Sequence, residues 1–365
     1  MQLNVWFNSG VSLTAIMRAI REQEKLILGR SKLINKIFCT HKNPYFIGFP
    51  EADHAEAEPH LTGDAYVAWA LEFSRRHEIN RFVVGDHFQA ITQAQAQFEA
   101  QGVQLVYGCP ADKWNLIDDK SLFYSTLGEQ GHTTMLPNWM VWNDGLADGL
   151  DCSIDWILSQ ITHADKVETP VCTKPVQGIF GQGFFRFNDT PDPEQQLFQP
   201  ERKIIKSADF AALAHQAGLA NGHRNWMVME FLPGPEYSVD CLAWEGKLVS
   251  AVTREKQGGK GQVIVYDPVI QAYVQTLIDV FQLNGVFNAQ FLRDAQGQLK
   301  VLEINPRFSG GTGMSVRAGV NLPWWWLKLT AGGRAEDVPQ PEIGLRVQAL
   351  ITHVPLQCFP SQTQG

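Results

Sequence analysis

Hydrophobic runs of two different periods alternate along the opening third of the chain. Leu13, Ile16, Met17 and Ile20 recur at intervals of three or four residues, so residues 12–24 form a predicted helix. The same reasoning predicts helices over 64–77 and 91–101, and β-rich runs predict strands over 3–7, 36–40, 81–84 and 103–107. This β–α–β order predicts a small parallel sheet with right-handed crossovers, and hence an α/β fold.

The pattern changes after about Trp114, where short strand-like runs are joined by Pro- and Gly-containing turns. These runs predict antiparallel strands over 171–175, 183–187, 226–231, 237–244 and 248–254, and a hairpin over 288–305. Helices are predicted over 208–218, with Ser207 as the N-cap, and over 268–281 and 323–330. The Pro-, Asp- and Gln-rich stretch 188–202 is interpreted as a surface loop.

Composition and charge narrow the class of protein. A chain of 365 residues exceeds the usual span of one hydrophobic core, which predicts two or three domains. The net charge of −8, without a Lys/Arg run, argues against a nucleic-acid or membrane partner. Six scattered cysteines without a metal-type spacing indicate free thiols. Because the start lacks a signal peptide and the run at 322–329 is too short to span a bilayer, we expect a cytoplasmic protein.

The segment VLEINPRFSGG, residues 301–311, places polar side chains where a buried strand would have apolar ones. A turn centred on residues 296–297 would put Gln290 directly across the hairpin from Glu303, with Asn305 one pleat further on. These three side chains offer hard oxygen atoms, which magnesium prefers, and Arg307 beside them suits phosphate oxygens. The alternative is a polar, solvent-facing sheet edge.

Two further stretches suggest nucleotide chemistry. In TKPVQGIFGQGFFRF, residues 173–187, Lys174 ends a strand before a turn rich in glycine, whose N–H groups can line a phosphate site. A plain glycine-rich hairpin is an equally good interpretation. In MVMEFLPGPEYSVD, residues 227–240, Glu230 ends an apolar strand and Glu236 follows the turn, where a carboxylate can accept ribose hydroxyls. Such a carboxylate is more often a solvated turn residue.

The order of these stretches resembles the ATP-grasp superfamily, and most closely the biotin carboxylase and carbamoyl-phosphate synthase large-chain group. DDKSLFYSTL, KPVQGIFGQG, MEFLPGPEYSVD, FNAQFL and VLEINPRFSGG are similar to that family's motifs from about Val103 to Gly333. The resemblance implies ATP as cofactor, with Mg²⁺ or Mn²⁺. It implies nucleotide binding by Lys120, Lys174, Gly178, Gly181, Gly183, Glu230, Phe231, Leu232 and Glu236. It also implies metal ligation by Gln290, Glu303 and Asn305, and catalytic roles for Arg307, Lys174 and Arg254.

The resemblance also implies an architecture. We expect a pre-ATP-grasp βαβ domain over residues 1–112, a two-lobed ATP-grasp domain over 113–345 and a C-terminal tail over 346–365. Within the ATP-grasp domain, an α+β lid is expected over about 122–230, followed by the antiparallel metal-binding sheet. The stretch 188–202 and the loop 254–263 match no substrate pattern. Because closed two-fold assemblies are common, a homodimer is one expectation for the assembly.

The implied activity is that of an ATP-dependent ligase, which activates a small carboxylic acid as an acyl phosphate and joins it to an amine. Metal and arginine neutralise the charge of the attacking carboxylate, so no side-chain nucleophile is needed. One alternative is phosphorylation of bicarbonate or carbamate, and another is an ATP-binding regulator without catalysis. The His54/His60 pair and His87 after Asp86 do not fix a metal geometry by their spacing.

Overall fold

A computed structural model of the chain describes residues 2–27, 32–145, 154–162, 170–178, 181–199, 202–258, 261–350 and 353–359. The chain divides into two compact units. The first unit contains residues 1–114, 237–290 and 304–365, and the second contains 115–236 and 291–303. The hairpin of β14 (Gly285–Arg293) and β15 (Leu299–Asn305) therefore begins in the first unit and has its tip in the second.

The first unit contains a five-stranded parallel sheet of order β3-β2-β1-β4-β5. Its strands are β1 (Leu3–Phe7), β2 (Ile34–His41), β3 (His54–Ala57), β4 (Arg81–Val83) and β5 (Gln104–Val106). The predicted parallel sheet is confirmed. The sequence pattern missed β3, because HAEA lacks the β-branched and aromatic residues that mark a strand.

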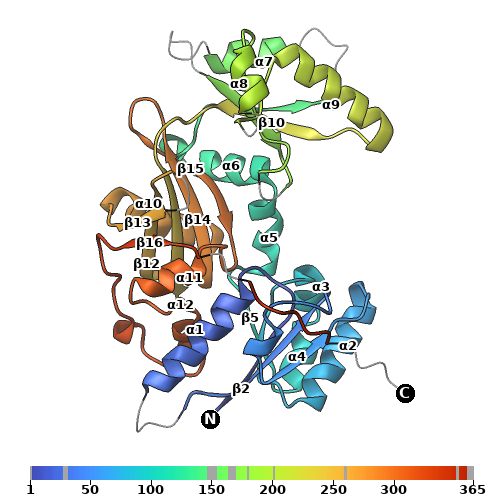
Figure 1. The fold of residues 1–365 in the computed structure, drawn as a ribbon, viewed down its shortest axis with the longest axis vertical. Coiled ribbons are helices and arrows are strands. Elements are labelled where there is room, and N and C mark those ends of the chain that lie inside the picture. Colours follow the sequence, from blue (N-terminus) through green and yellow to red (C-terminus); the bar gives the residue numbers. More distant parts are fainter. Residues whose placement is uncertain are drawn as a thin grey trace. The chain divides into compact units, whose positions relative to one another are not determined.

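Helices cover both faces of this sheet (Figure 1). Helix α1 (Leu13–Leu26) lies on one face, and α2 (Gly63–Arg76), α3 (Phe88–Gln93) and α4 (Gln95–Ala100) lie on the other. The single helix predicted over 91–101 is wrong, because the backbone at Ala94 adopts φ −92° and ψ 11° and separates α3 from α4. The residues between Ile91 and Phe98 are Thr, Gln and Ala, with no Gly or Pro to indicate this break.

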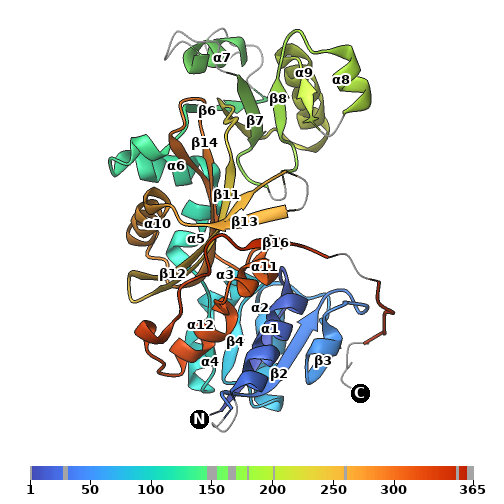
Figure 2. The same cartoon turned by 60° about the vertical axis from the view of Figure 1, so that its left-hand side comes forward.

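A six-stranded sheet has the order β15-β14-β11-β12-β13-β16. Its other strands are β11 (Glu236–Trp244), β12 (Lys247–Lys256), β13 (Gly261–Val265) and β16 (Arg346–Gln348). Helix α10 (Pro268–Phe281) begins where predicted, because Asp267 caps it by accepting from the N–H of Val269 and Pro268 suits the first helical position. Helices α11 (Thr312–Arg317) and α12 (Leu322–Thr330) follow β15 and contact α1 (Figure 2).

The second unit contains a sheet of order β6-β10-β7-β8-β9, in which β10 pairs antiparallel with both β6 and β7. Its strands are β6 (Trp139–Asn143), β7 (Val171–Pro175), β8 (Phe185–Phe187), β9 (Ile204–Ile205) and β10 (Asn225–Glu230). Its helices are α6 (Lys120–Glu129), α7 (Ile154–Thr162), α8 (Pro193–Phe198) and α9 (Ser207–Asn221). Helix α5 (Ala111–Asp118) crosses the boundary between the units. The described residues also form the 3₁₀ turns η1 (Phe49–Glu51), η2 (Thr133–Met135) and η4 (Ala335–Asp337).

Two local predictions in the second unit are wrong. The stretch 188–202 is not loop throughout, because α8 occupies its centre. Ser207 is the first residue of α9 rather than its cap. Its N–H and Oγ both donate to Oδ1 of Asp189, so the capping oxygen comes from a residue 18 positions earlier.

Each unit has its own hydrophobic core. In the first unit, Ile16, Met17 and Ile20 of α1 pack with strand residues of the parallel sheet and with Trp326 of α12. In the second unit, Phe210 of α9 packs with Trp226 of β10 and its neighbours. Among the described residues, no helix combines the length and the apolar character needed to cross a membrane.

Candidate active site

Lys120 is placed by a helix cap in the second unit. Asp119 accepts hydrogen bonds from the N–H groups of Ser121 and Leu122, which makes Lys120 the first residue of α6. Its side chain is 7% exposed, and Nζ donates to the carbonyl oxygen of Gly178 at 2.9 Å. The predicted DDK motif therefore holds a buried cation against the first glycine of the predicted phosphate loop.

The glycine-rich segment follows β7. Gly181 and Gly183 have φ of 64° and 70°, a region that favours glycine. A side chain on Gly183 would overlap Pro175, so that position admits only glycine. Lys203 Nζ donates to the carbonyl oxygen of Gly181 at 2.9 Å. Residues 179 and 180, inside the predicted loop, lie outside the described residues.

Lys174, at the end of β7, keeps some exposed surface and lies above an aromatic ring. Its Nζ is 6.0 Å from the ring centroid of Tyr124, whose hydroxyl donates to the carbonyl oxygen of Val301 at 2.9 Å. Loss of hydration lowers the pKa of Lys174 to about 8; the carboxylate of Glu303 opposes this shift and the cation of Lys120 adds to it. The second unit thus brings two predicted phosphate-binding lysines close to a predicted metal ligand.

The predicted adenine hinge follows β10. Oε2 of the buried Glu230 accepts from Nδ2 of Asn138 at 2.9 Å, and the N–H of Phe231 donates to the carbonyl oxygen of Pro170. The guanidinium of Arg186 lies 4.5 Å from the centroid of the Phe231 ring. Leu232 is buried, yet within the described part of the chain its backbone N–H donates to no partner. Backbone N–H groups in buried segments usually have a partner, so this donor is a candidate to bind a ligand.

The hairpin carries the predicted metal ligands, but its turn is one residue earlier than predicted. The N–H of Gly297 donates to the carbonyl oxygen of Asp294, so the turn centres on Ala295 and Gln296. The direct pairing of Gln290 with Glu303 was inferred from the later turn and stays a prediction. Glu303 lies two residues before Asn305 on β15, so both side chains point to the same face of the strand.

Asn305 and Arg307 are hydrogen-bonded to each other in the first unit. Nη2 of Arg307 donates to Oδ1 of Asn305 at 3.1 Å, and Nη1 donates to the carbonyl oxygen of Phe308. The arginine is therefore positioned beside a predicted metal ligand by the backbone that follows β15. Glu236, the predicted ribose ligand, is the first residue of β11 and is partly exposed.

Arg254, the third predicted catalytic residue, is 2% exposed and lies in a buried polar network of the first unit. Its Nη2 is 3.2 Å from Oδ2 of Asp240 and also donates to Oγ of Ser238 and of Ser309, while Nη1 donates to Gln262 and Nε donates to Ser315. Asp240 also accepts from Nδ2 of Asn288 at 2.8 Å. The network fixes the loop after β15 to β11 and β12.

The chain is similar to several known proteins in sequence or in fold. Residues 222–353 match a family model described as ATP-grasp in the biosynthetic pathway with Ter operon. An N5-carboxyaminoimidazole synthetase from Staphylococcus aureus, solved with ADP, is 13% identical with a TM-score of 0.63, over 94% of this chain and 81% of its own. An L-amino acid ligase from Bacillus licheniformis is 15% identical with a TM-score of 0.60, over 93% and 78%. Residues 222–353 are thus similar to an ATP-grasp family, and the solved structures share the fold of the chain.

Other comparisons set the limits of this similarity. A pyruvate carboxylase from Rhizobium etli is 15% identical with a TM-score of 0.60 over 94% of this chain, which spans only 30% of that longer chain. No curated protein sequence matches the chain. At these identities the solved structures establish the ATP-grasp fold, and the roles of individual residues stay predictions.

The sequence motifs missed a polar cluster in the parallel sheet of the first unit. At the carboxyl ends of β1 and β4, Oδ1 of Asn8 accepts from the N–H of Gly85 at 2.7 Å. The N–H of Ser9 donates to Oε1 of Glu58. Two buried atoms of this cluster, Oε2 of Glu58 and Nε2 of His87, have no hydrogen-bond partner among the described residues. The available signal was NSG and GDH directly after buried strands.

Arg307 lines a small cavity at the same edge of the sheet. The cavity has a volume of about 20 Å³, enough for about one water molecule, and it is also lined by Gly10, Gly85 and Tyr107. Open α/β sheets bind ligands at the carboxyl ends of strands where the strand order reverses. Strand β1, between β2 and β4, is that position here.

Proposed function

We propose that the protein is an ATP-dependent ligase that activates a small carboxylic acid as an acyl phosphate and joins it to an amine, releasing ADP and phosphate. The observation that carries this proposal is the group of charges in the second unit. There, Nζ of Lys120 donates to the carbonyl oxygen of Gly178 at 2.9 Å, and Nζ of Lys174 lies 6.0 Å from the ring centroid of Tyr124, whose hydroxyl donates to the backbone of Val301, two residues before Glu303. The charges of Lys120 and Glu303 both act on the pKa of Lys174. Two cations and a carboxylate suit a metal-bound polyphosphate better than they suit a structural core.

The nucleotide would be held by groups on either side of β10. Lys120 and Lys174 would bind phosphate oxygens, with the glycine-rich segment over them. The N–H of the buried Leu232 would donate to the adenine ring, and Glu236 would accept from the ribose hydroxyls. The S. aureus neighbour that contains ADP supports a nucleotide in this fold.

The donor atoms fit magnesium or manganese. Gln290, Glu303 and Asn305 offer amide and carboxylate oxygens, the ligands that these hard cations prefer. Oδ1 of Asn305 already accepts from Arg307, and its second lone pair can serve a metal. A bound metal would neutralise charge on the transferring phosphoryl group.

The proposed reaction has two steps. A carboxylate oxygen of the acid forms a bond to the γ-phosphorus, the bond from that phosphorus to the β–γ bridging oxygen breaks, and ADP leaves. The amine nitrogen then forms a bond to the acyl carbon, phosphate leaves with the former carboxylate oxygen, and the amine loses its proton to solvent. Arg307, beside Asn305 and at the end of β1, would neutralise the carboxylate during the first step.

An isotope experiment tests the acyl phosphate. ADP release is first screened over pools of amino acids and other small carboxylic acids with amine acceptors, and mass spectrometry identifies the product. The active acid is then labelled with oxygen-18 in its carboxyl group. We expect one label in the released phosphate for each molecule of product formed.

The same experiment separates the alternatives. ADP release that requires bicarbonate, rather than an organic acid, would favour the carboxylase-like reaction. Binding of ATP without release of ADP under any condition would favour a regulator. Formation of product with unlabelled phosphate, or with AMP in place of ADP, would rule out the acyl-phosphate step.

A further inference from the structure

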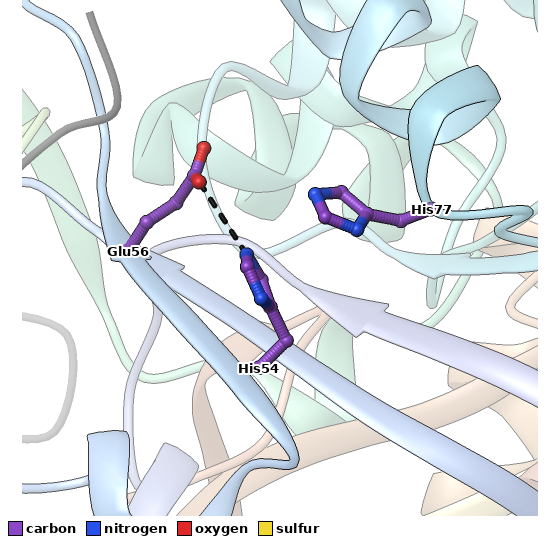
Figure 3. Close-up of side chains that lie close together, drawn as sticks. All are labelled: His54, Glu56 and His77. Carbon is purple, nitrogen blue, oxygen red and sulfur yellow. Dashed lines mark hydrogen bonds and ion pairs between the residues drawn. The ribbon is translucent and has the colours of Figure 1, made fainter.

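Three side chains of the first unit gather at the edge of the parallel sheet that is opposite to Arg307. His54 and Glu56 lie two residues apart on β3 and so share a face, while His77 directly follows α2. One potential ligand atom from each lies within 4.8 Å of the other two. Figure 3 shows the two imidazole rings and the carboxylate facing one another.

The hydrogen bonds of this cluster leave one ligand atom without a partner. Nε2 of His54 lies 3.4 Å from Oε2 of Glu56, and Nη2 of Arg76 lies 3.3 Å from the other carboxylate oxygen. Nε2 of His77 is buried and has no hydrogen-bond partner among the described residues. Buried polar atoms in proteins nearly always have a partner, and a cation would supply one here.

The imidazole of His77 lies between aromatic rings and the ring of His54. The centroid of its ring is 4.5 Å from that of Phe73 and 5.2 Å from that of Phe38. The centroids of the His77 and His54 rings are 4.3 Å apart, so the two imidazoles lie close enough to share one ion.

The guanidinium of Arg76 already interacts with the carboxylate that a bound metal ion would need. Its side chain is 34% exposed, so it can turn into solvent and release the carboxylate of Glu56. A divalent ion would then interact with both oxygens of the buried Glu56. His54 is 28% exposed, which leaves a route from solvent and room for a water ligand.

We propose that His54, Glu56 and His77 bind a divalent transition-metal ion of the zinc type. Two imidazole nitrogens and one carboxylate, with water in a fourth position, are a common ligand set for Zn²⁺, whereas Mg²⁺ prefers oxygen ligands throughout. The ion would tie the edge strand β3 to the end of α2, at the amino ends of the parallel strands. It is distinct from the magnesium set on β15 and independent of the proposed ligase activity.

Metal titration of the protein tests the site. The protein is treated with EDTA, dialysed, and titrated with Zn²⁺ and Co²⁺ in the presence of a phosphine reductant. We expect one equivalent of Zn²⁺ to bind, a rise of the Tm with Zn²⁺ but not with Mg²⁺, and visible absorption from bound Co²⁺. A wild-type protein that binds no Zn²⁺ tightly would overturn the proposal.

Variants locate the bound ion. His54→Gln and His77→Gln should each weaken Zn²⁺ binding by more than about tenfold, and His60→Gln, at an exposed histidine on the same segment, should leave it unchanged. Arg76→Gln should tighten binding, because it removes the competing cation, whereas a purely structural role for Arg76 predicts no gain. Equal affinity in wild type and His77→Gln would overturn the proposal.

A measurement on the wild-type protein does not depend on any variant folding. X-ray absorption at the zinc edge should show nitrogen and oxygen ligands, with the outer-shell scattering of two imidazoles. Sulfur scattering would place the ion at a cysteine and contradict the proposed site. Because none of these readouts is enzymatic, a failed ligase assay would not affect them.

Discussion

Nζ of Lys120 donates a 2.9 Å hydrogen bond to the carbonyl oxygen of Gly178. The two residues are 58 positions apart, and Asp119 fixes the lysine at the start of α6. The cation therefore holds the first part of the glycine-rich segment before any nucleotide is present. In the proposed ligase, the same amino group would serve both the segment and the phosphates.

Replacement of Lys120 by Gln should weaken ADP binding at least about tenfold, because a charge-assisted hydrogen bond contributes about 1.5–3 kcal/mol. Isothermal titration measures the affinity, and hydrogen exchange over 170–178 should become faster. Lys203→Gln is the matched control, since Lys203 is exposed and bonds to Gly181. It should speed exchange over 181–187 and leave the affinity unchanged; equal losses in both variants would contradict a phosphate role for Lys120.

The pKa of Lys174, near 8, predicts how ADP binding depends on pH. Above this pH the free protein loses the charge that attracts phosphate, so the affinity should fall as the pH rises from 7 to 9.5. Lys174→Arg keeps its charge and should show a shallower fall. Parallel profiles for wild type and Lys174→Arg would exclude Lys174 as the titrating group.

The same shift affects stability in the opposite direction. An unfolded lysine titrates near 10.4, so between about 8 and 10.4 the unfolded chain binds a proton that the folded chain does not. The titration of Lys174 therefore increases the free energy of unfolding, and so stabilises the folded protein, as the pH rises through this window. Comparison of urea unfolding for wild type and Lys174→Met isolates this contribution.

Glu303→Gln should remove the metal dependence of catalysis and change the titration of Lys174. Loss of the charged ligand should lower metal-dependent ADP release by orders of magnitude, while circular dichroism shows an intact fold. The carboxylate of Glu303 raises the pKa of Lys174, so that pKa should drop further below 8 in the variant. A variant with wild-type turnover would refute the metal assignment.

Gly311→Ala should disturb Arg254, because an added methyl group would overlap its guanidinium. We expect a lower Tm and a loss of activity if Arg254 is catalytic. Gly310→Ala is the matched control, since a methyl group there meets no atom within 4 Å. Similar effects at both glycines would mean that backbone flexibility, rather than contact with Arg254, explains the pair.

Arg254→Met should lower the free energy of unfolding by about 3–5 kcal/mol, because it leaves the buried carboxylate of Asp240 without its cation. The double variant Arg254→Met/Asp240→Asn should recover part of this loss, since no uncompensated charge remains. Denaturant unfolding of the four proteins of this cycle measures the coupling. Additive effects would show that the ion pair does not contribute as a unit.

The elements with strong periodic patterns could be predicted from the sequence. Helix α10 has both its cap and its apolar face within a few residues, and its predicted bounds, 268–281, are confirmed. Strand β3 was missed because its stability comes from pairing with β2 at residues 38–41, which HAEA itself does not encode. The capping oxygen of α9 was misassigned because it belongs to Asp189, outside the window of a local pattern.

In the candidate site, too, local patterns could be predicted and contacts made by tertiary structure could not. Motifs of adjacent residues, such as Glu303, Asn305 and Arg307, were visible as soon as the strand was recognised. The partners that tertiary structure supplies were not. His77 joins His54 and Glu56 only because α2 ends beside β3. The spacing of His54 and His60 fixed no metal geometry, and the structure does not place His60 in this cluster.

The contacts of α1 with α12 have a consequence for biosynthesis. Nε1 of Trp324 donates to Oε1 of Glu24, and Nδ2 of Asn321 donates to the carbonyl oxygen of Ala19, across separations of 300 and 302 residues. A ribosome completes all five strands of the parallel sheet long before it makes these partners. The nascent sheet thus carries a helix with an uncovered apolar face and a carboxylate without its tryptophan. A chaperone that recognises exposed apolar helix surface has its target on α1 until the segment around residue 324 emerges.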